Sequence, residues 1–279
     1  MKIRAYAKIN LGLHIIGKRA DGFHNIETIF HRINLFDELT VLPSHSISLS
    51  STEVNLPNDS GNLCWKAAEL LRNELGTANG ISIHIMKSIP IGAGLGGGSS
   101  DAAAVLRSLP KLWNVSVPPH TLELLALQLG SDVPFFLRDA SAYATGRGEV
   151  LQYRALKIPY WIVVVTPNIS INTAWAYNEL SKKNLYVEKK TPVFQQFENN
   201  AVDFTALEND FEKVVFPAHS EIGEVKTTLQ EHGAIVALMS GSGSSVFGLF
   251  EQEADARRAA ATFKGEYCVS MTEPSFIPN

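Results

Sequence analysis

The chain has 279 residues, 45% hydrophobic and 19% charged, a balance typical of a folded globular protein and not of a disordered one. Its 24 Lys and Arg against 28 Asp and Glu give a net charge of −4, so the basic excess expected of a nucleic-acid-binding protein is missing. Cys64 and Cys268 are too few for a disulfide framework, and no apolar run approaches the roughly 18–20 residues of a membrane helix. Without a signal-peptide pattern at the N-terminus, we expect a cytoplasmic protein with no nucleic-acid or membrane partner.

Strands dominate the first 60 residues. The segments expected as strands are Lys2–Ala7, Ile9–Ile16, Ile26–Leu35 and Glu38–Leu42, with a turn at Gly17–Gly22. Leucines and alanines at helical spacing then predict a helix from Leu63 to Leu75, ended by Gly76. The remaining elements expected in the first half are a strand at Gly80–Ser88, a helix beginning near Ser99 and a helix at Pro119–Leu129.

The second half again alternates strands and helices. Tyr160–Thr166 is expected as a buried strand and Thr173–Ser181 as a helix, followed by a polar surface connection at Lys182–Asn200. The later expected elements are helices at Glu221–His232 and Ala254–Lys264 and strands at Ala234–Met239, Val246–Phe250 and Tyr267–Thr272. This order predicts an α+β protein in two domains, residues 1–155 and 156–279.

The strongest local signal is a loop rich in glycine between a predicted strand and a predicted helix. Five glycines fall between positions 92 and 98, so backbone amides there can approach an anion with no Cβ in the way. The following helix adds unpaired amides and a positive dipole end. The alternative is a flexible turn with Ser99 as the helix N-cap, which needs fewer glycines. The residues predicted to bind phosphate are Pro90, Gly92, Gly94, Leu95, Gly96, Gly97, Gly98, Ser99 and Ser100.

Several common phosphate-binding motifs do not fit this loop. Its Gly92-x-Gly94-x-x-Gly97 spacing matches the dinucleotide fingerprint, but the stretch Leu109–Thr121 lacks the acidic residue that should follow. No Lys follows Gly98, which excludes a Walker A loop. The protein-kinase motifs His-Arg-Asp and Asp-Phe-Gly are absent from the sequence.

Three motifs in order along the chain resemble those of the GHMP kinases, named for galactokinase, homoserine kinase, mevalonate kinase and phosphomevalonate kinase. They are Ala7-Lys8-Ile9-Asn10-Leu11 near the N-terminus, the glycine loop continuing into Ser99-Ser100-Asp101-Ala102-Ala103, and Met239–Ser245 near the C-terminus. The resemblance implies the two-domain GHMP kinase fold, with a nucleotide-binding N-terminal domain and a smaller α+β C-terminal domain. It also implies ATP as co-substrate, with Mg²⁺ carried by the nucleotide.

The resemblance assigns catalytic roles to two residues. Asp132 follows the helix stop Gly130 and precedes Pro134, and it would act as the base that takes the acceptor hydroxyl proton. Lys8 lies in an apolar strand, and its ammonium would stabilise the charge on the transferred phosphoryl group. From the residues alone, Asp132 is equally explained as a turn cap and Lys8 as a lysine reaching solvent at a sheet edge. The histidines other than His24, among them His14, show no metal-ligand spacing, and no protein metal ligand is predicted.

Within the family, the sequence is most similar to members whose acceptor carries a cytidine diphosphate group. The similarity rests on Gly17–His24, Gly130–Phe136, Gly146–Glu149 and the region around Tyr177. It implies that Phe23 and Tyr177 stack on the base, that His24 reads its polar edge and that Asn10 orients the substrate. The simpler reading of Phe23 and His24 is a hydrophobic contact beside an exposed histidine.

The expected activity is therefore ATP-dependent phosphorylation of a small alcohol in a cleft between the two domains. Two alternatives stay open. One is a GHMP kinase of the homoserine or mevalonate type, and the other is a nucleotide sensor that has lost catalysis. The Ser240–Ser245 loop is expected to close over the substrate, although a simple turn between strands also fits it. The oligomeric state stays open.

Overall fold

The computed structural model describes residues 1–183, 185 and 202–278. Its strands are β1 (Lys2–Lys18), β2 (His24–Ser44), β3 (Ile47–Ser51), β4 (Gly80–Met86), β5 (Ser141–Thr145), β6 (Val150–Arg154), β7 (Trp161–Thr166), β8 (Val236–Met239), β9 (Val246–Phe250) and β10 (Cys268–Thr272). Its helices are α1 (Leu63–Glu74), α2 (Gly97–Leu112), α3 (Pro119–Leu129), α4 (Thr173–Lys182), α6 (Glu212–Ala218), α7 (Ser220–Glu231) and α8 (Glu253–Phe263), with short 3₁₀ turns at Pro134–Leu137 and Phe204–Ala206. The α+β class expected from the sequence is confirmed.

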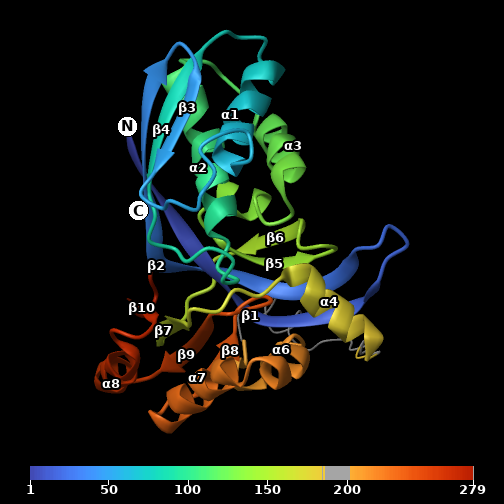
Figure 1. Ribbon diagram of the computed structural model, residues 1–279, viewed down its shortest axis with the longest axis vertical. Coiled ribbons are helices and arrows are strands. Elements are labelled where there is room, and N and C mark those ends of the chain that lie inside the picture. Colours follow the sequence, from blue (N-terminus) through green and yellow to red (C-terminus); the bar gives the residue numbers. More distant parts are fainter. Residues whose placement is uncertain (184, 186–201, 279) are drawn as a thin grey trace.

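Two sheets organise the chain. The first runs in the order β3-β4-β2-β5-β6, with β1 also paired to β2, and α1, α2 and α3 cover one of its faces (Figure 1). The second is antiparallel in the order β10-β7-β9-β8, with α7 and α8 packed on it. The connection between β6 and β7 contains the predicted division at 155/156. That division stays a prediction, because β1 and β2 also reach the second sheet.

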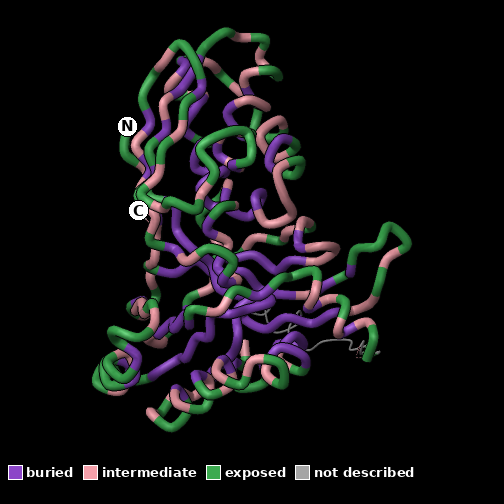
Figure 2. The backbone as a smooth tube through the Cα atoms, viewed as in Figure 1, coloured by how far each residue is buried: buried purple, intermediate pink, exposed green. Residues whose placement is uncertain are grey.

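The two long strands β1 and β2 form the centre of the molecule. Residues 5–15 of β1 are buried without interruption, since the first sheet, the loop after β4 and the second half of the chain all pack against them (Figure 2). β1 and β2 pair over almost their full length, with register shifts between Tyr6 and Lys8 and between Leu11 and Leu13. These irregularities re-aim the side chains that follow them, Lys8 and Leu13.

The predicted breaks inside both long strands are wrong. Lys2–Ala7 and Ile9–Ile16 form one strand, as do Ile26–Leu35 and Glu38–Leu42. Asp37, which separates the second pair, continues β2 because its buried carboxylate accepts hydrogen bonds from the backbone of Ser88 and Ile89. A partnered carboxylate is tolerated inside a sheet, and sequence pattern alone does not reveal the partner.

Among the described strands and α-helices, β3, β5, β6 and α6 were not predicted. β6 alternates exposed and half-buried residues, and α6 is only seven residues long, so neither carries a strong hydrophobic period. The surface connection expected at Lys182–Asn200 lies mostly outside the described residues.

None of the helices in the described part of the chain has the length and apolar character needed to cross a membrane.

Candidate functional site

The glycine loop connects β4 to α2 and lines a cavity of about 300 Å³. Gly92, Gly94 and Gly96 have φ values of +67°, +77° and +71°, a left-handed conformation that other residues rarely adopt. A Cβ on Gly96 would lie 2.9 Å from the Phe136 ring and 3.2 Å from Lys8 Cε. The loop therefore needs glycine both for its backbone conformation and for the space around it. The predicted residues that line this cavity are Pro90, Gly92, Gly94, Gly96, Gly97, Gly98 and Ser99.

Two of the predicted phosphate ligands lie elsewhere. The Ser100 hydroxyl is buried and donates a hydrogen bond of 2.7 Å to the Tyr6 carbonyl, which fixes the first turn of α2 to β1. Leu95 packs in the hydrophobic core, and its carbonyl accepts a hydrogen bond from the Lys8 amide at 3.0 Å. Both residues therefore attach the glycine loop and the start of α2 to β1.

Lys87 was missed by the sequence analysis, although it lines the same cavity. Its ammonium contacts the buried carboxylates of Asp37 and Asp101, the latter at 3.1 Å. Burial raises the pKa of Asp101 to about 8, with Lys87 opposing that rise. Its position just before the glycine loop could have marked it as a candidate site residue. Its buried acidic partners, Asp37 and Asp101, are 50 and 14 positions away in the sequence and could not be predicted.

A second cavity, of about 200 Å³, shares Gly92, Gly94 and Gly96 with the first. Lys8, Asn10, Asp132 and Tyr177 of the predicted site line it, together with Arg147 of the Gly146–Glu149 motif, to which the sequence analysis gave no role. The alternate glycines therefore form a common wall between a cavity lined mostly by residues 90–99 and a cavity that contains charged and polar side chains.

Lys8 and Asp132, 124 positions apart in the sequence, meet in this second cavity. Lys8 Nζ lies 3.8 Å from Asp132 Oδ2, and the two side chains are 5% and 35% exposed. The ammonium also donates hydrogen bonds to Asn10 Oδ1 at 2.6 Å and to the Gly94 carbonyl at 3.0 Å. Burial lowers the pKa of Lys8, and the Asp132 carboxylate partly offsets that effect. The ammonium is thus held by oxygen atoms at the glycine wall, beside a carboxylate open to the cavity.

Asn10 is held from both sides by a hydrogen-bonded chain. Its Nδ2 donates to Thr28 Oγ1 at 2.9 Å, and that hydroxyl donates to the Gly12 carbonyl at 2.6 Å. Its backbone amide donates to Ser240 Oγ at 3.2 Å. Since all these partners are buried, the Asn10 amide has a fixed orientation and presents its oxygen to Lys8.

The C-terminal loop packs directly against the glycine loop. Ser240 Oγ donates to the Gly94 carbonyl at 3.0 Å, and a Cβ on Gly94 would lie only 2.1 Å from the Ser240 carbonyl oxygen. Gly241 and Ser242 line the second cavity. The connection between β8 and β9 thus forms one side of the second cavity, and its closing over a substrate stays a prediction.

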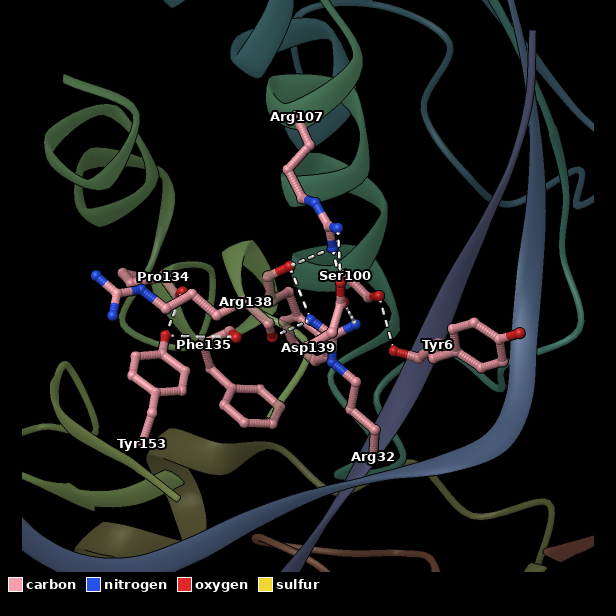
Figure 3. Close-up of polar contacts among 10 residues, drawn as sticks. Tyr6, Arg32, Ser100, Arg107, Pro134, Phe135, Arg138, Asp139 and Tyr153 are labelled. Carbon is pink, nitrogen blue, oxygen red and sulfur yellow. Dashed lines mark hydrogen bonds and ion pairs between the residues drawn. The ribbon is translucent and has the colours of Figure 1, made fainter. Parts of the chain in front are cut away.

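The segment that carries Asp132 is clamped from two directions (Figure 3). Asp139 accepts a bidentate pair of hydrogen bonds from Arg107 of α2, at 2.9 and 2.8 Å, and one of 2.6 Å from Arg32 of β2. Arg32 also donates to the carbonyls of residues 136 and 138, and the Tyr153 hydroxyl donates to the carbonyl of residue 134 at 2.9 Å. These bonds tie the Asp132 segment to α2, whose first turn borders the first cavity.

Of the aromatic residues predicted to bind the base, the structure brings two together. His24 stacks on Tyr177 with ring centroids 4.6 Å apart and an interplanar angle of 13°. Burial lowers the pKa of His24 and raises that of the Tyr177 hydroxyl. Phe23 is 53% exposed and lies under the guanidinium of Arg147, whose Cζ is 4.8 Å from the ring centroid. In this structure the Tyr177 ring therefore stacks on His24, and the Phe23 ring on Arg147.

Comparisons with known proteins show which family this chain belongs to. A family model for the GHMP kinases N terminal domain matches residues 62–139, and one for the GHMP kinases C terminal domain matches residues 191–269. A protein of Prosthecochloris aestuarii named 4-diphosphocytidyl-2-C-methyl-D-erythritol kinase is 45% identical over 99% of this chain and 98% of its own length. A protein of the same name from Chlorobaculum tepidum is 42% identical over 98% of this chain and 97% of its own.

Solved structures show the same relationship. A crystal structure of 4-(cytidine 5'-diphospho)-2C-methyl-D-erythritol kinase superposes with a TM-score of 0.84, at 35% identity over 99% of this chain and 100% of that one. A crystal structure of mevalonate kinase superposes with a TM-score of 0.69 at 16% identity over 100% of both chains, which shows a shared fold only. The chain belongs to the GHMP kinases and, within them, to the family of 4-diphosphocytidyl-2-C-methyl-D-erythritol kinases.

Proposed function

We propose that this chain transfers the γ-phosphoryl group of ATP to the 2-hydroxyl of 4-diphosphocytidyl-2-C-methyl-D-erythritol, a step in isoprenoid precursor synthesis. The observation that carries the proposal is the pair of cavities on the two sides of the glycine strip. One, the nucleotide-side cavity, is lined mostly by residues 90–99, whose backbone would receive phosphates. The other, the acceptor-side cavity, holds Lys8 and Asp132 within 3.8 Å of each other. Family membership supplies the identity of the acceptor.

The nucleotide-side cavity would receive the triphosphate of ATP. A Cβ at Gly96 or Gly97 would lie within about 3 Å of neighbouring side chains, so close packing requires glycine at these two positions, next to the first turn of α2 whose unpaired amides favour an anion. Ser99 lines the same cavity, and Lys87 adds a positive charge there. Mg²⁺ bound to the nucleotide would neutralise charge on the phosphate oxygens, and Ser99 is the predicted hydroxyl on this side that remains available to it.

On the acceptor side, Asp132 would accept the proton of the 2-hydroxyl as its oxygen attacks the γ-phosphorus. A bond forms between that oxygen and phosphorus, and the bond from phosphorus to the bridging oxygen breaks to leave ADP. Lys8 would stabilise the negative charge on the transferred group, because its ammonium lies at the glycine wall between the cavities. Asn10 would fix the position of both the ammonium and the substrate.

Phe23, His24 and Tyr177 would bind the cytosine ring. In the structure the His24 ring covers one face of Tyr177, so a base held between Phe23 and Tyr177 displaces that ring. His24 would then present a ring nitrogen to the polar edge of the base. Arg147 lines the acceptor-side cavity and stacks on Phe23, so its guanidinium would contact the diphosphate of the substrate.

The direct test is a phosphotransfer assay of the purified full chain with ATP, Mg²⁺ and a panel of alcohols: the cytidyl compound, homoserine and mevalonate. We expect ADP release and a product one phosphate heavier with the cytidyl compound only. Turnover of homoserine or mevalonate without turnover of the cytidyl compound would reject the proposal. ATP binding without transfer to any alcohol would favour the sensor alternative.

A further inference from the structure

His14, Glu208 and Asp210 form a group outside both cavities, where residues 208–210 pair with β1. Glu208 and Asp210 flank Asn209, which forms a bridge with Leu13 of β1. The Leu13 amide donates to the Glu208 carbonyl at 2.8 Å, and the Asp210 amide donates to the Leu13 carbonyl at 2.9 Å. Because residues two apart along an extended segment share a face, this pairing places both carboxylates on the same side as His14.

The imidazole of His14 is buried and its Nδ1 makes no hydrogen bond. The side chain is 7% exposed, and Nδ1 points toward Asp210 Oδ2 at 3.6 Å, beyond hydrogen-bonding distance. The Asp210 side chain is 2% exposed. A buried nitrogen without a partner is unfavourable, so an atom placed between it and the carboxylate would remove that cost.

We propose that His14, Glu208 and Asp210 bind a divalent transition-metal cation. One ligand atom from each residue lies within 4.8 Å of the other two. A donor set of one imidazole and two carboxylates suits Zn²⁺, Mn²⁺ or Co²⁺, whereas Mg²⁺ and Ca²⁺ prefer oxygen ligands alone. Glu208 is exposed, which leaves a side open to solvent where water completes the coordination.

The Asp210 carboxylate is held by two further contacts. Its Oδ1 lies 2.6 Å from the Lys213 ammonium. The other oxygen, Oδ2, accepts a hydrogen bond from the Ile15 amide at 2.9 Å. These contacts orient the Asp210 carboxylate, as outer partners do in metal sites, and leave Oδ2 directed toward His14 Nδ1.

The position of the group gives the cation a structural role near the acceptor cavity. Asn209, between the two carboxylates, donates hydrogen bonds to the Met239 carbonyl at 2.6 Å and to the Gly241 carbonyl at 2.8 Å. A cation bound here would fasten residues 208–210 to β1 and, through Asn209, steady the loop beside Gly241. This site is separate from the Mg²⁺ carried by the nucleotide, and the inference does not rest on the proposed reaction.

The test uses full-length protein treated with a chelator and studied without nucleotide. Isothermal titration with Zn²⁺ and Mn²⁺ should show one bound equivalent, Co²⁺ should give a visible absorption band, and Mg²⁺ should not compete. Thermal unfolding should shift upward by about 3–6 °C at a hundredfold excess over the dissociation constant. Absence of one-equivalent binding by any of these transition metals up to millimolar concentration would overturn the proposal.

Variants locate the binding to these side chains. His14→Gln and Glu208→Gln should each weaken binding at least about tenfold, since even outer partners of metal ligands are worth 10–100-fold. His84→Gln is the matched control, because His84 is exposed on β4 and bonds only to Ser50 among the described contacts. Equal binding by wild type and His14→Gln would contradict the assignment. Glu208 is exposed, so its variant keeps the test valid if the buried His14 substitution impairs folding.

Discussion

The two cavities that share the glycine strip differ in how the chain builds them. The nucleotide-side cavity is made largely from one continuous segment, residues 90–99, and depends on the absence of side chains. The acceptor-side cavity collects Lys8, Asp132 and Tyr177 from segments more than a hundred residues apart at its extremes, and depends on their charge and orientation. Phosphates are alike in all nucleotides, so backbone suffices for them, whereas a particular alcohol needs positioned side chains.

The largest effect expected from testing this contrast is at Lys8. Lys8→Met removes the ammonium from the acceptor side and should lower kcat by about 10²–10³-fold, equivalent to about 3–4 kcal/mol, while the ATP dissociation constant changes little. Steady-state kinetics together with nucleotide titration measure both quantities. A loss of ATP affinity as large as the loss of kcat would show that Lys8 belongs to the nucleotide side instead.

The next effect tests the close approach of the two loops. Gly94→Ala would place a Cβ 2.1 Å from the Ser240 carbonyl oxygen at a φ of +77°, and it should lower the free energy of unfolding by about 3 kcal/mol. Gly98→Ala is the matched control, since its Cβ would meet nothing closer than 3.8 Å and it lies in α2. Urea unfolding measures both variants, and equal stability of the two would contradict the packing described here.

The third prediction concerns His31, which lines neither cavity, and it is tested by stability alone. Burial lowers the pKa of His31 to about 4 from its usual 6.5, so the unfolded chain binds a proton in this interval that the folded chain does not. The free energy of unfolding should therefore decrease as the pH is lowered, by about 2 kcal/mol from this group between pH 7 and pH 5. His31→Asn should lose this dependence, as measured by urea unfolding at both pH values. An identical pH dependence in variant and wild type would refute it.

The smallest effect distinguishes two adjacent serines. Ser100→Ala removes the hydrogen bond to the Tyr6 carbonyl and should cost about 1 kcal/mol of stability, with little change in the KM for ATP. Ser99→Ala should raise that KM and leave stability nearly unchanged, because Ser99 lines the nucleotide-side cavity. If Ser100→Ala instead raised the KM for ATP while Ser99→Ala lowered stability, Ser100 would be the residue that contacts the phosphates.

The same contrast explains how far the sequence predicted the molecule. The glycine loop could be predicted because its signal is local: five glycines close together before a helix have few other uses. The proximity of Lys8 and Asp132 was expected only through family resemblance, since it depends on how β1 and the segment after α3 pack. Lys87, Arg147 and the Arg107–Asp139 clamp were missed, because buried charges find partners through tertiary structure and leave no periodic pattern.

The stacking of His24 on Tyr177 was missed for the same reason. These residues come from β2 and α4, which meet only in the folded chain. The continuous β2 strand is a further case, since Asp37 lies between the two segments that were predicted as separate strands, and its carboxylate finds backbone partners at Ser88 and Ile89 only in the folded chain.

The central claim is that the Asp132 carboxylate receives the acceptor proton at the junction of the two cavities. The most direct measurement is kcat for Asp132→Asn, together with dissociation constants for ATP and the cytidyl alcohol. A lost general base predicts a fall in kcat of at least about 10²-fold, with both ligands bound nearly as tightly as by the wild type. A kcat close to that of the wild type would contradict the claim.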